Sequence, residues 1–251
     1  MSLADSTTEA AQRRRPHALV TGASRGLGLA LTHRLVALGW DVIGDARDGD
    51  RLHEALRRLD GRGRALPIPG DVADAAHRQT LADAVGSAGG LDLLVNNASV
   101  LGPSPQPELD RYPLDVLRTV YETNVLAPLA LVQLLLPALL AAGGTVVNVS
   151  SDAAVEAYPG WGGYGSAKAA LDHLSAVLAA EHPDVRVLAF DPGDMATDLQ
   201  QQAFPGEDVS DRADPASVVP ALLHLISGAY PSGRYRAADL TAEVGPEQAG
   251  A

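Results

Sequence analysis

Short apolar runs rich in β-branched residues alternate along this chain with longer stretches in which apolar residues recur at helical spacing. Each intervening stretch is long enough for a right-handed crossover, and such crossovers join parallel strands whose sheet is covered by helices on both faces. The predicted strands are residues 17–21, 41–45, 64–68, 91–96, 145–150, 185–190 and 233–237. The sequence therefore predicts an α/β fold of the doubly wound, Rossmann-like type, built on a mostly parallel seven-stranded sheet.

The length of the chain, 251 residues, suits one large domain. We expect this domain to span residues 16–240, between a mobile N-terminal leader, residues 1–15, and a mobile tail, residues 241–251. The leader is polar and lacks the apolar stretch of a secretion signal, so a cytoplasmic location is expected. The arginines at 13–15 either contact an acidic partner or belong to a solvated leader, and their polar surroundings favour the second interpretation.

Charge and cysteine content exclude several classes of function. The chain has 19 Lys and Arg against 31 Asp and Glu, a net charge of −12, which repels phosphate backbones and anionic lipid. We therefore expect neither nucleic acid nor membrane as a partner. Without cysteine there is no disulfide, thiolate metal site or cysteine nucleophile. The histidines show no metal-ligand spacing, and His53, His173 and His182 are interpreted as helix-surface residues, so no metal is expected.

The first predicted strand runs into a glycine-rich turn, residues 21–28, which opens a helix. Gly22 permits a tight turn, Gly26 lets the backbone approach a pyrophosphate, and Gly28 allows close helix packing. The helix N-terminus attracts the anion through its free N–H groups and its dipole. The turn therefore predicts a dinucleotide site whose contacts come from Gly22, Ser24, Arg25, Gly26, Leu27 and Gly28.

The glycine spacing G-x-x-x-G-x-G after a threonine resembles that of the short-chain dehydrogenase/reductase family, and the resemblance extends from residue 17 to about residue 240. Residues 96–99, Asn-Asn-Ala-Ser, match the family's N-N-A-G segment, with Ser99 in place of glycine. The family's catalytic tetrad corresponds to Asn124, Ser151, Tyr164 and Lys168. The resemblance also implies contacts with the nicotinamide half of the cofactor from Asn97, Ala98, Tyr164, Lys168, Pro192, Gly193 and Thr197.

The tetrad has a physical interpretation of its own. Tyr164 and Lys168 are four residues apart on one predicted helix, so their side chains share a face. A nearby ammonium group favours phenolate, and we expect it to lower the pKa of Tyr164 and make this residue the general acid in reduction, or the base in oxidation. Ser151 can donate a hydrogen bond to a carbonyl oxygen, and Ser150 is the competing candidate. In relatives the lysine also binds ribose hydroxyls, and Asn124 corresponds to a residue that holds a water.

The end of the second strand decides between NAD and NADP. Arg47 follows the position at which an acidic residue would bind the ribose 2′-hydroxyl, and Arg25 supplies a second cation, so NADP(H) is favoured. Asp45 and Asp48 oppose this choice, because either one can repel the phosphate or take the NAD role. Asp71 and Val72 resemble the pair that contacts adenine, although Asp71 can equally be a helix N-cap.

These patterns predict an NADP(H)-dependent oxidoreductase, most simply a ketone or aldehyde reductase acting on a small-molecule carbonyl or alcohol. Two alternatives stay open: a reductase of a carrier-bound biosynthetic intermediate, and a protein that senses NADPH without turnover. Residues 195–212 are predicted to form a mobile lid that adds Met195 and Phe204 to the pocket wall. Tyr158 and Trp161 either flank the substrate or pack in the core.

Residues 125–142 form the most apolar segment, but Pro128, Gln133 and Pro137 interrupt it, so we interpret it as a buried or subunit-facing helix rather than a membrane span. Residues 114–140 and 164–180 carry more apolar side chains than one sheet-facing side needs. In many relatives the equivalent helices form subunit contacts. A homodimer or homotetramer is therefore expected.

Overall fold

The computed structural model describes residues 14–241 of the chain. Most of the predicted leader and nearly all of the predicted tail lie outside these residues. Arg14 and Arg15 are described, and their guanidinium groups pair with Asp92 at 2.9 Å and with Asp41 at 3.4 Å. The backbone N–H of His17 also donates to the Asp92 carboxylate at 2.7 Å, so Asp92 binds the chain where the first strand begins.

The predicted parallel sheet is confirmed. Seven strands lie in the order β3-β2-β1-β4-β5-β6-β7, and every neighbouring pair is parallel. They are β1 (His17–Thr21), β2 (Asp41–Ala46), β3 (Arg64–Pro69), β4 (Leu93–Asn96), β5 (Thr145–Val149), β6 (Arg186–Asp191) and β7 (Gly233–Arg236). The predicted boundaries agree within two residues, and the largest difference is that β4 begins at Leu93 rather than at residue 91.

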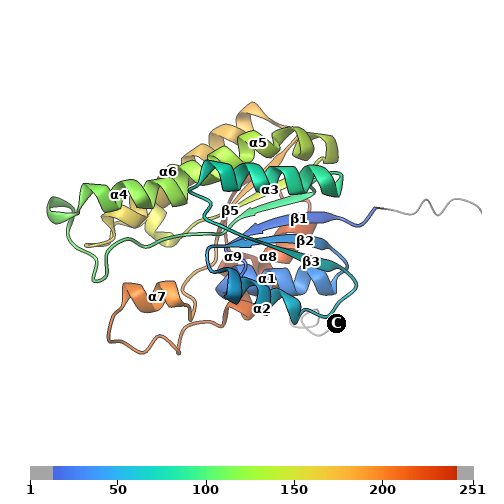
Figure 1. The fold of residues 1–251 in the computed structure, drawn as a ribbon. Coiled ribbons are helices and arrows are strands. Elements are labelled where there is room, and N and C mark those ends of the chain that lie inside the picture. Colours follow the sequence, from blue (N-terminus) through green and yellow to red (C-terminus); the bar gives the residue numbers. More distant parts are fainter. Residues whose placement is uncertain (1–13, 242–251) are drawn as a thin grey trace, which may run out of the picture.

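Helices cover both faces of the sheet (Figure 1). One face carries α1 (Gly26–Ala37), α2 (Gly49–Arg57), α8 (Pro215–Ser227) and α9 (Ala237–Thr241), and the other carries α3 (Ala75–Ala88), α5 (Ala127–Ala142) and α6 (Gly162–Glu181). The remaining helical elements are the 3-10 turns η1 (Leu109–Arg111) and η3 (Asp152–Ala154), α4 (Leu114–Tyr121), the π-helical η2 (Glu122–Leu126) and α7 (Asp198–Ala203). Each face of the sheet has its own apolar core, and both cores contain residues of the same sheet, as expected for a single doubly wound domain.

Polar residues at the helix ends explain several boundaries. Asp48, Asp74 and Asp214 stand at the N-caps of α2, α3 and α8, and each side chain accepts a hydrogen bond from a backbone N–H of the first turn. Gly89 and Gly143 end α3 and α5 with positive φ angles of 85° and 59°. Because a left-handed residue ends a helix at low cost only when it is glycine, these two positions fix where the chain returns to β4 and β5.

The stretch Leu114–Ala142, comprising α4, η2 and α5, is the one helical run in the described part of the chain that is long and apolar enough to cross a membrane. Its most apolar window has a mean hydropathy of 2.3, and 39% of that window is buried within the fold. Leu131, Leu135 and Leu139 pack on the sheet, as expected for a core helix. Leu114 and Leu126 are 63% and 48% exposed, so a second apolar side faces outward.

Candidate active site

A cleft of about 1370 Å³ lies beyond the carboxyl ends of the strands. In the strand order, β1 stands between β2 and β4, so the chain winds away in opposite directions on its two sides and opens a crevice there. Segments following β1, β2, β3, β4, β5 and β6 all line the cleft. Every residue predicted to bind a dinucleotide lines it except Gly28, and of the predicted tetrad Ser151, Tyr164 and Lys168 line it.

The glycine-rich turn is held against the segment that follows β4. Thr21 Oγ1 accepts from the backbone N–H groups of Asn97 and Ala98, both at 3.0 Å, and Asn97 Nδ2 donates to the backbone oxygen of Thr21 at 2.8 Å. Gly22 has a φ of 67°, and a Cβ on Gly28 would lie 2.3 Å from the Gly22 oxygen. Gly28 thus has the packing role predicted for it, although it does not face the cleft.

Asp45 and Asp48, the two acidic residues at the end of β2, both form hydrogen bonds within the protein. Asp45 is 1% exposed, and its Oδ1 lies 2.9 Å from Nε2 of His77 on α3. Burial raises the pKa of the Asp45 carboxyl above its usual value, and the hydrogen bond with His77 acts in the opposite direction. Asp48 caps α2 by accepting from the backbone N–H of Arg51 at 3.0 Å.

Among the arginines that line the cleft, Arg25 belongs to the glycine-rich turn, and Arg47 and Arg51 belong to the segment after β2. Arg51 is a residue that the sequence reasoning missed, and its position four residues after Arg47, at the start of a helix, was the available signal. Arg25 and Arg51 both pair with Asp198 of α7, Arg51 at 3.5 Å. These contacts bring the glycine-rich turn, α2 and α7 together around one carboxylate.

Asp71 and Val72 follow β3 and line the same cleft. The alternative that Asp71 caps a helix is wrong, because the N-cap of α3 is Asp74. The Asp71 side chain instead closes a turn by accepting from the backbone N–H of Ala73 at 2.9 Å.

Asn124 lies in the π-helical turn η2 and is 1% exposed. Its Oδ1 accepts from the backbone N–H of Val100 at 2.9 Å, and its Nδ2 donates to the Val100 backbone oxygen at the same distance. Asn124 does not line the cleft. The widened helical turn therefore points the amide at the loop after β4 and fixes the backbone of that loop.

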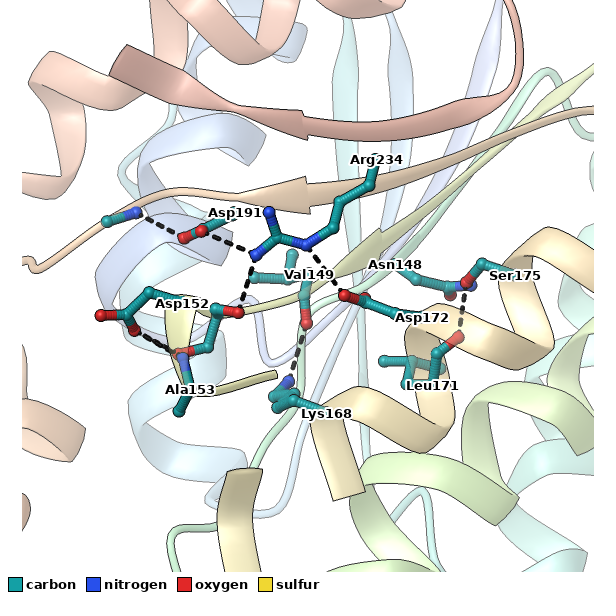
Figure 2. Close-up of polar contacts among 12 residues, drawn as sticks. Asn148, Val149, Asp152, Ala153, Lys168, Leu171, Asp172, Ser175, Asp191 and Arg234 are labelled. Carbon is teal, nitrogen blue, oxygen red and sulfur yellow. Dashed lines mark hydrogen bonds and ion pairs between the residues drawn. The ribbon is translucent and has the colours of Figure 1, made fainter. Parts of the chain in front are cut away.

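Tyr164 and Lys168 lie one turn apart on α6 and are 6% and 2% exposed. Lys168 Nζ donates to the backbone oxygen of Val149 at 2.7 Å, as Figure 2 shows, and lies 5.5 Å from the centre of the Tyr164 ring. Burial lowers the pKa of Lys168 to about 8, and Asp172 partly opposes this shift. Burial also raises the pKa of Tyr164 well above its ordinary value. The expected lowering of the Tyr164 pKa is wrong for this structure, because desolvation of the phenolate dominates.

Ser151 and Ser150 both line the cleft, where β5 ends. Ser151 Oγ donates to Oδ1 of Asp152 at 2.9 Å and accepts from the backbone N–H of Ala153 at 3.2 Å. Ser150 is 2% exposed, and its hydroxyl has no hydrogen-bond partner among the described residues. Ser151 therefore carries the more accessible hydroxyl of the two.

A partly buried ionic cluster lies beside Ser151, one of the predicted tetrad residues, and the sequence reasoning did not find it. Figure 2 shows the guanidinium of Arg234, on β7, between the carboxylates of Asp172 and Asp191, both at 2.9 Å. The same guanidinium donates to the backbone oxygen of Ser151 at 2.9 Å. Asp191 in turn accepts from the backbone N–H of Gly193 at 3.0 Å. Arg234 thus connects the end of β5, helix α6 and the loop after β6.

Aromatic rings gather beside Tyr164. The ring of Trp161 lies 5.9 Å from that of Tyr164, 6.0 Å from Phe204 and 6.5 Å from Tyr158. Of these four residues, Trp161 and Tyr164 line the cleft. Phe204 follows α7, inside the predicted lid, whose residues Met195, Thr197 and Leu199 also line the cleft. The cleft therefore has an aromatic wall beside Tyr164.

The residues described contain no group of three or more His, Asp or Glu side chains that could hold a metal ion. Comparison with known families finds that residues 16–208 match the short chain dehydrogenase family. The match therefore covers the glycine-rich turn, the tetrad positions and most of the predicted lid.

Curated relatives and solved structures agree with this match. Sepiapterin reductase of Mus musculus is 37% identical over 199 residues, which cover 74% of this chain and 76% of that protein. The (S)-benzoin-forming benzil reductase of Saccharomyces cerevisiae is 31% identical over 221 residues, which cover 84% of this chain and 81% of that protein. A short chain dehydrogenase from Shigella flexneri, solved in complex with NADP, has a TM-score of 0.83 at 28% identity, covering 89% of this chain and 97% of that one.

Proposed function

This chain belongs to the short chain dehydrogenase family of oxidoreductases, and from that premise we propose that it reduces ketones or aldehydes to alcohols with NADP(H) as the cofactor. One observation carries the proposal: Tyr164, Lys168 and Ser151 line the same cleft as the glycine-rich turn and the arginines after β2. NADPH bound in this cleft, with its pyrophosphate at the glycine-rich turn, would share the cleft with Tyr164 as a proton donor.

The choice of NADP(H) rests on the charges at the end of β2. Arg47 lines the cleft, with Arg25 and Arg51 beside it, and guanidinium groups suit a 2′-phosphate. Asp45 is buried and contacts His77, and Asp48 accepts a hydrogen bond as the N-cap of α2, so both carboxylates already have a partner within the protein, which favours the arginines as the cofactor contacts. The NADP bound by the Shigella flexneri relative supports the same choice.

When bound, NADPH supplies the hydride. The chain's own residues manage the proton and the charge. Tyr164 Oη donates a proton to the substrate oxygen as negative charge develops there, and Ser151 Oγ turns from Asp152 to hydrogen-bond the same oxygen. Lys168, held by the Val149 oxygen, keeps a positive charge beside the phenolate that forms. The proton passage through Asn124 that the family resemblance implies stays a prediction.

The cleft beside Tyr164 favours a carbonyl compound with a substantial apolar part. Trp161 and Leu199 line the cleft near Tyr164, and Leu101 and Ala153 pack with Tyr164 in a small apolar cluster. Both curated relatives described above are named as reductases, which supports reduction as the working direction. Beyond its substrate and further copies of itself, we propose no partner for this chain, and a cytoplasmic location remains a prediction.

The test is an NADPH-oxidation screen over ketones, quinones and aldehydes, run with the wild-type protein and the Tyr164→Phe variant. We expect Tyr164→Phe to abolish turnover and to leave NADPH affinity, measured by fluorescence titration, nearly unchanged. The substitution removes one proton donor and no predicted phosphate contact. If the wild type binds NADPH but turns over no carbonyl compound, the proposed reductase function is wrong. The alternative, a protein that senses NADPH without turnover, is then favoured. Equal turnover by both proteins would remove Tyr164 from the mechanism.

A further inference from the structure

The hydroxyl of Ser99 lies between two residues of the predicted tetrad. Ser99 lines the cleft in the loop after β4, and its Oγ donates to Oδ1 of Asn124 at 3.2 Å. The same side chain also acts on the Tyr164 hydroxyl, because hydrogen bonding with Ser99 lowers the pKa of Tyr164. The family segment that this loop resembles has a glycine here. Ser99 thus gives this chain a side-chain link between Asn124 and Tyr164.

A serine hydroxyl has one hydrogen and can accept as well as donate. While Tyr164 is protonated, its O–H can donate to Ser99 Oγ, which donates to Asn124. If the Ser99 hydrogen turns toward Tyr164, Asn124 keeps its two hydrogen bonds with the Val100 backbone, both at 2.9 Å. Rotation of the Ser99 hydroxyl therefore leaves the Asn124 amide with hydrogen-bond partners. The direction of the hydroxyl hydrogen depends on whether Tyr164 is protonated.

The phenolate that remains after proton transfer needs such a donor. Tyr164 is 6% exposed, so water gives it little stabilisation. Lys168 Nζ donates one of its hydrogens to the Val149 oxygen and lies 5.5 Å from the ring centre. Hydrogen bonds to a charged oxygen are stronger than those between neutral groups.

We propose that Ser99 is a positioning residue that donates its hydroxyl hydrogen to Tyr164 Oη when Tyr164 has given its proton to the substrate. This inference rests on the proposed reductase function and adds to it a residue outside the tetrad. The proton balance is simple: the Tyr164 proton goes to the substrate oxygen, and the Ser99 hydrogen turns from Asn124 to Tyr164 without leaving Ser99. In alcohol oxidation the same events run in reverse.

The hydrogen bond from Ser99 lowers the pKa of Tyr164, against the larger effect of burial. The charged groups that face Tyr164 are Lys168 on α6, Asp152 in η3 and Asp191 at the end of β6. All three remain when Ser99 alone is replaced. A difference between the variant and the wild type therefore isolates the serine hydroxyl.

The test measures kcat/KM for alcohol oxidation against pH, with saturating NADP+. The phenolate is the base in this direction, so the rate rises as Tyr164 ionises, and the positive charge of bound NADP+ would lower the Tyr164 pKa from its raised value in the empty protein. We expect Ser99→Ala to move the midpoint of this rising limb about one pH unit higher, the shift that loss of a hydrogen bond to a charged group produces. Ser99→Thr keeps a hydroxyl and should restore the wild-type midpoint. Ser166→Ala is the matched control, because the Ser166 hydroxyl bonds the Gly163 backbone oxygen and does not face the cleft.

A second readout needs no turnover. In protein labelled with 13C at tyrosine Cζ and saturated with NADP+, the Tyr164 resonance is assigned by its loss in Tyr164→Phe, and its chemical shift follows ionisation. Ser99→Ala should move that titration to higher pH, by the same amount as it moves the rising limb of kcat/KM against pH. An unchanged midpoint in Ser99→Ala would overturn the role of Ser99, even in an active reductase. A wild-type protein inactive on every carbonyl would overturn the proposed function, and the Tyr164 titration would still decide the role of Ser99.

Discussion

Nε2 of His77 lies 2.9 Å from Oδ1 of Asp45, and both side chains are buried where β2 ends at the cleft. A Cβ at Gly70 would lie 2.1 Å from the His77 ring, so the ring fits beside Asp45 only because residue 70 is glycine. The pair holds the Asp45 carboxylate buried, so the exposed Arg47 is the more accessible charged group at this end of the cleft.

Arg47 should therefore decide cofactor choice. We expect Arg47→Ala to weaken NADPH binding roughly 10- to 100-fold, as expected for the loss of a hydrogen bond between charged groups, and to leave NADH binding nearly unchanged. Isothermal titration with both cofactors measures this. Arg57→Ala, at the end of α2 and outside the cleft, is the control. A wild-type preference for NADH would show that an acidic residue at the end of β2 has the deciding role.

Burial of Lys168 should appear as a pH dependence of stability. An unfolded lysine keeps its proton up to about pH 10.5, whereas folded Lys168 releases it near pH 8. Between these values the unfolded state holds more protons, so the free energy of unfolding should rise with pH. Urea unfolding at pH 7.5 and pH 10 measures this rise, and Lys168→Met should show a smaller one. An equal rise in the free energy of unfolding for the wild type and Lys168→Met would contradict the low pKa of Lys168.

Loss of Arg234 should destabilise the protein and disturb its active site. Asp191 and Asp172 have side chains only 3% and 14% exposed, and Arg234→Met leaves both without their cation. We expect a loss of roughly 3 kcal/mol or more in the free energy of unfolding. Arg236→Met, at an exposed position on the same strand, should change it by less than about 0.5 kcal/mol. Adding Asp172→Asn and Asp191→Asn should recover part of the loss, and no recovery would show that the charges are not its cause.

We propose that residues 195–212 act as a lid, and hydrogen exchange tests this. The segment contacts the rest of the protein partly through exposed ion pairs, such as that between Asp198 and Arg51, so it should open at a low free-energy cost. Protection should rise from the apo protein to the NADPH complex and again in a ternary complex. Helix α8, with its buried leucines, should stay protected throughout. A segment already fully protected in the apo protein would be fixed structure, not a lid.

The outward apolar side of α4, η2 and α5 should mediate self-association. Leu114, Leu126, Leu134 and Leu140 are 63%, 48%, 41% and 41% exposed, and covering such side chains is favourable. We expect a dimer or tetramer by light scattering at micromolar concentration, and Leu126→Glu with Leu134→Glu should shift it toward monomer. A wild-type protein that scatters only as a monomer would refute this.

The features that the sequence by itself determined depend on neighbours in the chain. Apolar runs that alternate with stretches of helical spacing located all seven strands. The glycine-rich turn lies between β1 and α1 as predicted, and the spacing of four residues put Tyr164 and Lys168 on one helical face. These features follow from backbone geometry and helical periodicity, which act over a few residues.

Only the tertiary structure decided the features that depend on contacts between distant segments. It pairs Asp45 with His77, 32 residues away, and Arg234 with Asp172, 62 residues away. It also reverses the expected direction of the Tyr164 pKa shift, because the degree of burial depends on every element packed around α6. Local pattern fixes which groups are present and on which element they lie. The partners and the solvent exposure of those groups are set only when strands and helices from the whole chain have packed together.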